Sequence, residues 1–184
     1  MNIILASQSP RRKELMEKLN IPFTVRVADI DETPVSGLTP AENVARISRC
    51  KALAIPRQPE DIVIAADTIV VLGNTILGKP RDEEDAKKML QQLSGNCHQV
   101  MTGLTVLRGD KLVSVTEITD VYFRPLTEQE IAAYIATKDP MDKAGGYGIQ
   151  NGAALFVEKI HGDYFNVVGL PVCRLGLVLK EFGL

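Results

Sequence analysis

A phosphate-binding segment is predicted at the start of the chain, where an apolar run at residues 3–6 is followed by Ser7-Gln8-Ser9-Pro10-Arg11-Arg12. Ser9 suits the N-cap of a helix, and Pro10 suits its first position. Arg11 and Arg12 then stand in the first turn, where the helix dipole disfavours cations unless an anion lies between them. The free N–H groups of a helix start and the planar arginine forks both favour phosphate. A solvated basic helix start is the alternative.

Asp67 interrupts an apolar stretch that covers residues 62–66 and resumes at residues 69–72. Burying a lone carboxylate costs several kcal/mol, so Asp67 needs a partner, a metal ion or a place at a cleft. We expect Asp67 at the carboxyl end of a strand, where α/β sheets carry their sites. There it would bind Mg²⁺ or activate a water molecule. A structural aspartate that caps a turn is the alternative.

Two lysines are candidates for phosphate contacts. Lys51 follows Val44 and Ile47 at helical spacing and therefore lies on or beside the inward face of a predicted helix. It either reaches a phosphate or runs its stem along apolar surface to solvent. Lys79 lies between a glycine and a proline, in a constrained turn where the glycine lets a ligand approach the backbone.

An acidic loop offers oxygen ligands for a divalent cation. Glu32, with Asp29 and Asp31, stands in the polar stretch at residues 28–38. Carboxylate oxygens are the ligands that hard cations prefer. A plainly solvated acidic loop is the alternative.

A glycine-rich segment at residues 142–150 reads Asp-Lys-Ala-Gly-Gly-Tyr-Gly-Ile-Gln. Such a density of glycine indicates a loop that approaches a ligand or adopts positive φ, or else a flexible loop. Gln150 carries both a donor and an acceptor. That pair matches the N3–H and O4 edge of uracil or thymine.

The elements that must position these residues alternate between helices and strands. Helices are expected from residue 10 to 19, from a capping box at Thr39 to about residue 55, after caps at Asp82 and Thr127, and at 172–182. Strands are expected at 23–27, 62–72 with a break at Asp67, 100–123 as a hairpin, and 154–160. This order predicts an α/β fold around a mixed sheet, in one domain over residues 1–184.

Composition excludes several classes of protein. The chain is 45% hydrophobic and 24% charged, as is typical of a globular protein. A net charge of −2 gives no basic field for nucleic acid, and no apolar run reaches the length of a membrane span. The three cysteines are few and far apart, which favours free thiols in a reducing cytoplasm.

Taken together, the chain resembles the Maf family of nucleoside triphosphate pyrophosphatases over essentially its whole length. Seven segments carry the resemblance. They are Ala6-Ser7-Gln8-Ser9-Pro10-Arg11-Arg12, Lys51-Ala52, Ala66-Asp67-Thr68-Ile69-Val70, Gly78-Lys79-Pro80-Arg81, Thr102-Gly103, residues 142–150, and Asn166-Val167-Val168-Gly169-Leu170-Pro171.

The resemblance implies hydrolysis of a nucleoside triphosphate to the monophosphate and pyrophosphate, with a divalent metal, Mg²⁺ or Mn²⁺. It implies an elongated mixed β-sheet flanked by helices, with two lobes around a cleft. It also implies a cytoplasmic protein, often a homodimer, that removes unwanted nucleotides from the pool. No nucleic acid and no membrane are expected as partners.

The resemblance also implies roles for particular residues. The family's catalytic proton acceptor falls on Asp67, which with Glu32 is expected to hold the metal. The positions associated with base choice fall on Arg12, Thr68 and Gln150, and their identities resemble the branch that acts on dTTP, UTP and modified pyrimidine nucleotides. The family's other polar site positions fall on Ser9, Glu32, Lys51 and Lys79, and the sequence departs from the family pattern at none of the positions named. Arg11 is also expected to bind the substrate, because of its place in the basic helix start.

Two other functions compete with this interpretation. A purine-type pyrophosphatase acting on ITP would differ only in the base pocket, where Gln150 and Thr68 favour a pyrimidine. A nucleotide-binding regulator of cell division or septum formation would need no water-activating group. The presence of Asp67, Lys51 and Lys79 therefore favours an enzyme.

Overall fold

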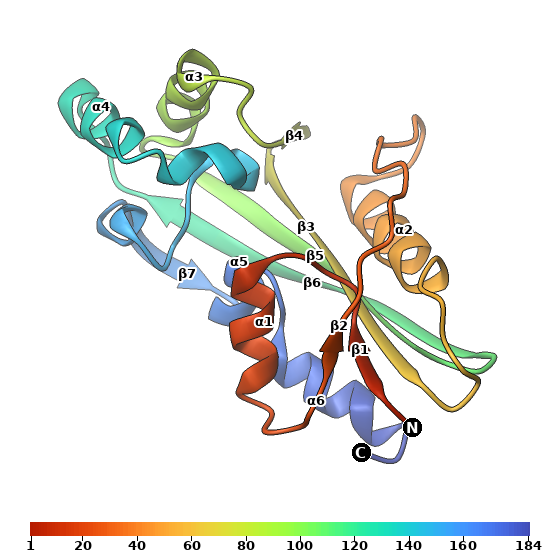
Figure 1. Ribbon diagram of the computed structural model, residues 1–184. Coiled ribbons are helices and arrows are strands. Elements are labelled where there is room, and N and C mark those ends of the chain that lie inside the picture. Colours follow the sequence, from red (N-terminus) through yellow and green to blue (C-terminus); the bar gives the residue numbers. More distant parts are fainter. The chain divides into compact units, whose positions relative to one another are not determined.

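The structure, a computed structural model, describes residues 1–184 and contains a single mixed sheet (Figure 1). The strands are β1 (Ile3–Leu5), β2 (Thr24–Val25), β3 (Ile62–Leu72), β4 (Thr75–Leu77), β5 (Cys97–Arg108), β6 (Lys111–Phe123) and β7 (Val157–His161). Their order is β2-β1-β3-β5-β6-β7, with β4 paired to β3. β1 pairs in parallel with β2 and β3, whereas β6 and β7 are antiparallel. The predicted mixed sheet is confirmed.

Six helices and three short 3₁₀ turns accompany the sheet, which confirms the α/β class. The helices are α1 (Pro10–Glu17), α2 (Pro40–Leu53), α3 (Glu83–Leu93), α4 (Glu128–Ala136), α5 (Tyr164–Val168) and α6 (Val172–Lys180). The 3₁₀ turns are η1 (Asp139–Asp142), η2 (Ala144–Gly146) and η3 (Gly152–Leu155). No helix is long and apolar enough to cross a membrane.

The chain gathers into two compact units, each with its own packing. Unit 1 comprises Met1–Thr68, Thr102–Glu117 and Gly169–Leu184, and unit 2 comprises Ile69–Met101 and Ile118–Val168. The elongated outline, the cleft and the single domain over residues 1–184 stay predictions.

Four of the predicted helix starts are confirmed, and each of the four depends on a local hydrogen bond. Ser9, Thr39, Asp82 and Thr127 all occupy N-caps whose side chains accept from a backbone N–H of the first turn. At Thr39 and Thr127 the full capping box forms, because the Glu42 and Glu130 side chains accept from the backbone N–H groups of Thr39 and Thr127, respectively.

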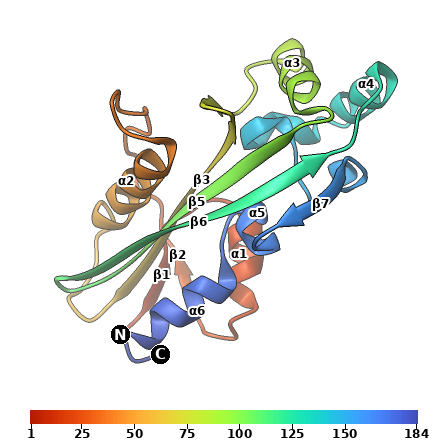
Figure 2. The same cartoon turned by 180° about the vertical axis from the view of Figure 1, so that it is seen from behind.

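In unit 1, α2 lies on one face of the strands, and α1 and α6 lie on the other (Figures 1 and 2). Alternate residues of the strands point to opposite faces. The residues packed with Ala52 of α2 and with Ile55, which follows the helix, are Ile4, Ala6, Val63, Ala65 and Leu107.

The contact between α2 and β5 is unusually close. A Cβ atom on Gly103 would lie 2.4 Å from the carbonyl oxygen of Val44, so only glycine fits there. One turn along, the Ser48 hydroxyl lies 2.8 Å from the Thr105 hydroxyl, and both side chains are buried. This contact fixes the position of α2, the helix that carries Lys51.

Unit 2 is built around α3, α4 and a cluster of aromatic rings. α3 packs against α4 and against η2. His98, Phe123, Tyr147 and Phe156 form edge-to-face contacts with centroids 4.8–6.0 Å apart. Tyr147 belongs to the glycine-rich segment and is 5% exposed. The segment is therefore packed into the unit, and the alternative of a flexible loop is not supported.

One element differs from the prediction in a way that concerns the site. β3 runs without a break through Asp67 and Thr68, so the placement of Asp67 at the end of a strand is wrong. The polar pair does not end the strand because side chains from α1 and α2 meet it, one on each face. In addition, β2 is shorter than expected, β7 begins at Val157 rather than at residue 154, and α5 was not predicted.

Candidate active site

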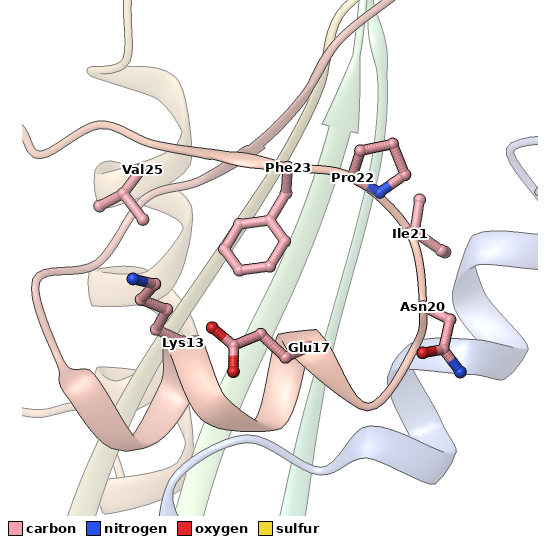
Figure 3. Close-up of a pocket in the computed structure, with 7 residues that line it drawn as sticks. All are labelled: Lys13, Glu17, Asn20, Ile21, Pro22, Phe23 and Val25. Carbon is pink, nitrogen blue, oxygen red and sulfur yellow. The ribbon is translucent and has the colours of Figure 1, made fainter.

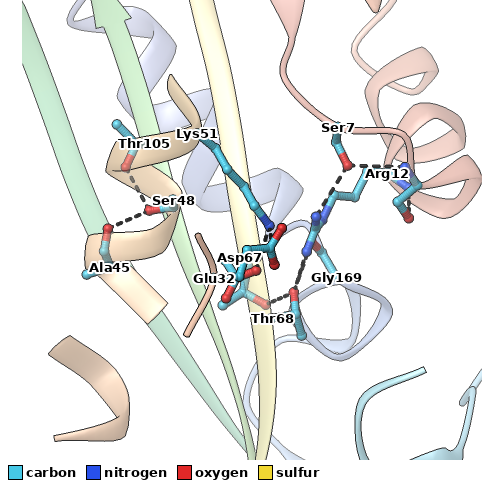
Figure 4. A network of polar contacts seen from close by, with 12 residues as sticks. Ser7, Arg12, Glu32, Ala45, Ser48, Lys51, Asp67, Thr68, Thr105 and Gly169 are labelled. Carbon is cyan, nitrogen blue, oxygen red and sulfur yellow. Dashed lines mark hydrogen bonds and ion pairs between the residues drawn. The ribbon is translucent and has the colours of Figure 1, made fainter. Parts of the chain in front are cut away.

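Lys51 joins two carboxylates on the α2 face of unit 1. Its ammonium nitrogen Nζ lies 2.8 Å from Asp67 Oδ1 and 3.0 Å from Glu32 Oε2 (Figure 4). The Lys51 and Asp67 side chains are only 16% and 11% exposed, whereas Glu32 is 56% exposed. Lys51 therefore does not extend to solvent, and the alternative of a stem that runs along apolar surface to solvent is not supported. Asp67 also has the partner that a buried carboxylate needs.

Arg12 forms a second polar group on the opposite face of β3. Its Nε donates to the carbonyl oxygen of Gly169 at 2.8 Å, and its Nη2 donates to Thr68 Oγ1 at 2.9 Å. Nη1 donates to Ser7 Oγ at 3.3 Å (Figure 4). A guanidinium carries five N–H groups, so one N–H on each Nη nitrogen is left for a ligand.

The two groups are neighbours because Asp67 and Thr68 are consecutive residues of one strand. Their side chains point to opposite faces. Asp67 shares its face with Val63 and Ala65, the face that packs on α2, and Thr68 meets α1. Thr68 also lies 2.9 Å from the Thr102 hydroxyl on β5. The strand therefore presents an anionic group on one face and a hydrogen-bonding group on the other.

Electrostatics link the two groups. Burial lowers the pKa of Arg12 below its ordinary value, and the negative charge of Asp67 opposes that shift. Arginine nevertheless keeps its charge in proteins. Arg12 is thus a fixed cation whose field reaches Asp67.

The loop that carries Glu32 is anchored on α2. The buried Asn43 side chain accepts from the Val35 N–H at 2.7 Å and donates to the Leu38 carbonyl at 3.2 Å. Arg46 donates to the Thr33 carbonyl at 2.7 Å. Asp31 accepts from the Thr33 N–H at 2.8 Å. Hydrogen bonds from the Thr33 side chain and from this N–H lower the pKa of Asp31. Its carboxylate therefore supports the turn next to Glu32.

The predicted phosphate-binding helix start has the expected backbone. Ser9 is the N-cap, its hydroxyl accepts from the Arg12 N–H at 3.5 Å, and its own N–H donates to Ser7 Oγ at 3.2 Å. Arg11 is half-buried. The structure brings Ser9, Arg12, Glu32, Lys51, Asp67 and Thr68 into unit 1.

Lys79 and Gln150 belong to unit 2, and both are exposed. Their segments are tied together, because the Gly145 N–H donates to the Gly78 carbonyl at 3.0 Å. Gly145 has a φ of +69°, which confirms the predicted positive φ in this segment. That Lys79 and Gln150 join the residues of unit 1 around one substrate stays a prediction.

Comparison with known proteins places the chain in a family. The family model described as Maf-like protein matches residues 2–182. The chain belongs to the Maf family. A dTTP/UTP pyrophosphatase of Bacillus cytotoxicus is 52% identical to this Maf protein over 97% of the chain and 94% of the relative. One of Clostridioides difficile is 50% identical over 99% and 95%.

A solved structure shows the same fold at low sequence identity. The HAM1 protein from Coxiella burnetii matches with a TM-score of 0.54 and 16% identity, covering 98% of this chain and 99% of that one. At this identity the match supports the α/β architecture alone.

Three residues contact Arg12 or Thr68 although the sequence analysis assigned them no role. They are Ser7, Thr102 and Gly169. All three lie within the segments that carry the Maf resemblance, and this was the only indication in the sequence that they belong to the site. Their contribution depends on long-range contacts, because Gly169 is separated from Arg12 by 157 positions.

A shallow pocket of ≈ 540 Å³ lies elsewhere in unit 1, between α1 and the segment that leads into β2 (Figure 3). Lys13 and Glu17 line one side of it, and Phe23 and Val25 line the other. None of the predicted site residues lines this pocket.

Proposed function

We propose that this Maf protein hydrolyses dTTP and UTP, and modified pyrimidine nucleotides, to the monophosphate and pyrophosphate. The observation that carries the proposal is the Lys51–Asp67–Glu32 group, in which Asp67 stands on β3 directly before Thr68, the residue that Arg12 contacts. Family membership and relatives of about half-identical sequence support the same substrates. Such an activity would remove unwanted nucleotides from the cytoplasmic pool.

The two carboxylates fit a divalent metal. Glu32 and Asp67 converge on one cation, the Lys51 ammonium, although their own charges repel. Hard carboxylate oxygens suit Mg²⁺ and Mn²⁺. No third histidine, cysteine or carboxylate joins them, so substrate phosphates and water would complete the coordination. When bound, the metal would neutralise phosphate oxygens and polarise the α-phosphorus.

Asp67 would act as the general base. Lys51 holds Oδ1, which leaves Oδ2 to accept a proton from water. The water oxygen would bond to the α-phosphorus, the bond from that phosphorus to pyrophosphate would break, and Oδ2 would take the water proton.

The other residues would bind the substrate. The N–H groups at the Ser9 cap, together with Arg11 and Lys79, would receive the leaving pyrophosphate. Arg12 and Thr68 would contact the base through the N–H groups that Arg12 has left. Gln150 would accept from N3–H and donate to O4 of uracil or thymine. A homodimer remains a prediction.

A nucleotide panel tests this proposal. Release of pyrophosphate is measured for dTTP, UTP, CTP, ATP, GTP, ITP and a methylated guanine nucleotide, with Mg²⁺ or Mn²⁺. We expect dTTP and UTP to be good substrates, and CTP and the purines to be poor ones. Preference for GTP, ITP or the methylated nucleotide would reject the base assignment. Absence of pyrophosphate with every nucleotide would reject the pyrophosphatase itself.

A further inference from the structure

We propose that Tyr134 and Asp139 are positioning residues for Gln150, holding the chain on both sides of it and thereby setting the choice of base. This inference rests on the proposed function, in which Gln150 contacts the pyrimidine. Neither residue would touch the substrate. Each acts through hydrogen bonds to the neighbours of Gln150 within unit 2.

On the N-terminal side, Tyr134 of α4 holds the backbone two residues before Gln150. Its hydroxyl accepts from the Gly148 N–H at 3.0 Å and donates to Asp139 Oδ2 at 2.5 Å. Tyr134 is 5% exposed, and its ring packs edge-to-face on Phe156 with centroids 5.2 Å apart. Burial raises the pKa of Tyr134, so the hydroxyl stays protonated and remains a donor to Asp139.

On the C-terminal side, Asp139 holds the residue directly after Gln150. Its Oδ1 accepts from the Asn151 side-chain amide at 2.6 Å. Asn151 in turn donates its backbone N–H to the Gly148 carbonyl at 3.1 Å, which closes a turn around Gln150. Gln150 is exposed at the tip of that turn. The turn is therefore bonded to the Asp139 carboxylate in two ways. Asn151 donates to it directly, and Gly148 is linked to it through the Tyr134 hydroxyl.

Asp139 is itself fixed by a buried lysine. Lys143 is 7% exposed, and its Nζ donates to the Asp139 carbonyl at 2.7 Å and to Asp139 Oδ1 at 3.1 Å. Burial alone would raise the pKa of Asp139, but hydrogen bonds from Tyr134, Asn151 and Lys143 outweigh it, and the pKa is lowered. A Cβ on Gly148 would lie 2.6 Å from Lys143 Cε, so the lysine packs directly against the segment.

This arrangement matters for specificity because uracil and cytosine differ only at the edge that Gln150 would contact. The Gln150 amide must present its acceptor to N3–H and its donor to O4. A displacement of about 1 Å suffices to lose on the order of a hundredfold in rate. A turn that is no longer held would let the amide flip, and cytosine would then be accepted as well.

The test is the ratio of kcat/KM for UTP to kcat/KM for CTP. In Tyr134→Phe the ring still packs on Phe156, and only the hydroxyl is lost. We expect the ratio to fall about tenfold or more, through a higher KM for UTP rather than a lower kcat. Asn151→Ala removes the other tie at an exposed position and should lower the same ratio even where Tyr134→Phe destabilises the fold. Tyr164→Phe, at an exposed ring that packs on Phe165, is the matched control and should leave the ratio unchanged.

Gln150→Ala separates this inference from the proposal on which it rests. If Gln150→Ala lowers the ratio while Tyr134→Phe and Asn151→Ala leave it within twofold of the parent, the positioning role is overturned and the base contact stands. An equal loss with UTP and CTP in the two positioning variants would also overturn it, because that is the result of a merely structural role. An unchanged ratio in Gln150→Ala itself would contradict the base contact and the positioning role together.

Discussion

The Asp67 carboxylate accepts a hydrogen bond from Lys51 at only one of its two oxygens, and this contact orients the other oxygen. Lys51 occupies Oδ1, and the Asp67 side chain is only 11% exposed. A carboxylate fixed in this way has one oxygen to offer to water, and its orientation costs nothing further at the moment of reaction. At the scale of single residues, the proposed chemistry depends on this pair.

Asp67→Asn should remove catalysis and spare binding. The amide has nearly the same shape, but it cannot take a proton from water, so turnover should fall about 10²–10⁴-fold. Steady-state hydrolysis of UTP and calorimetric binding of a non-hydrolysable UTP analogue measure the two effects. Asp110→Asn, the same change at the exposed β5–β6 turn, is the control. Turnover within threefold of the parent would remove Asp67 from the mechanism.

Lys51→Ala should strengthen the response to metal. The ammonium and a divalent cation would compete for the same oxygens of Glu32 and Asp67. Without nucleotide, Mn²⁺ should therefore raise the melting temperature of the variant by about 2–4 °C more than that of the parent, or about 1 kcal/mol. Lys88→Ala, which breaks a surface pair with Glu84, is the control. Equal shifts in parent and variant would place the metal elsewhere.

At the scale of elements, α2 is the part that assembles the site in unit 1. It carries Lys51, it anchors the Glu32 loop through Asn43 and Arg46, and it rests on Gly103. The position of α2 therefore determines both contacts of Lys51, the one with Glu32 and the one with Asp67.

Gly103→Ala should move α2 and lower both stability and turnover. The added methyl group meets the Val44 carbonyl at 2.4 Å, a backbone atom that cannot turn aside. Overpacking of this kind costs about 1–3 kcal/mol. Urea unfolding and UTP hydrolysis measure the two losses. Gly176→Ala in α6, which meets nothing within 4 Å, should be neutral or slightly stabilising. A Gly103→Ala protein as stable and active as the parent would contradict the role given to this contact.

The aromatic cluster of unit 2 should make stability fall in acid. Burial lowers the pKa of His98 to about 4, its Nε2 lies 2.7 Å from the Tyr147 hydroxyl, and its buried Nδ1 has no hydrogen-bond partner. The unfolded chain protonates this residue near pH 6.5. Between those values the unfolded state binds more protons, so stability is full above about pH 6.5 and is lost as the pH falls toward 4.

His98→Phe should flatten this dependence. Between pH 7 and pH 5, the free energy of unfolding should fall by about 2 kcal/mol less in the variant than in the parent. Urea unfolding at the two pH values measures this difference. His161→Gln, at an exposed histidine, should retain the full dependence. An unchanged slope in His98→Phe would show that His98 titrates normally in the folded protein.

For the whole molecule, features that depend on local signals could be predicted from the sequence. Ser9, Thr39, Asp82 and Thr127 cap helices because their side chains reach an N–H only two or three residues away. The β5–β6 hairpin follows from two strand patterns around a short turn. α5 was missed because five residues carry too little periodicity to show a helix.

Features that depend on contacts between distant segments could not be predicted in the same way. Polar residues at positions 67 and 68 resemble a break in an apolar strand unless Lys51 and Arg12 are known to meet them. The resemblance to the Maf family supplied the roles of these residues, and the fold supplied the pairing of Lys51 with Asp67 and Glu32. Tyr134 and Asp139 gave no signal, because their roles exist only through Gly148 and Asn151.

In the proposed reaction, water assisted by Asp67 attacks the α-phosphorus of a pyrimidine triphosphate. Hydrolysis of UTP in water enriched in ¹⁸O, with the products separated and analysed by mass spectrometry, shows which phosphorus the water attacks. We expect UMP and pyrophosphate as products, with one ¹⁸O in UMP and none in pyrophosphate. Label in pyrophosphate, or the formation of UDP and phosphate, would contradict it.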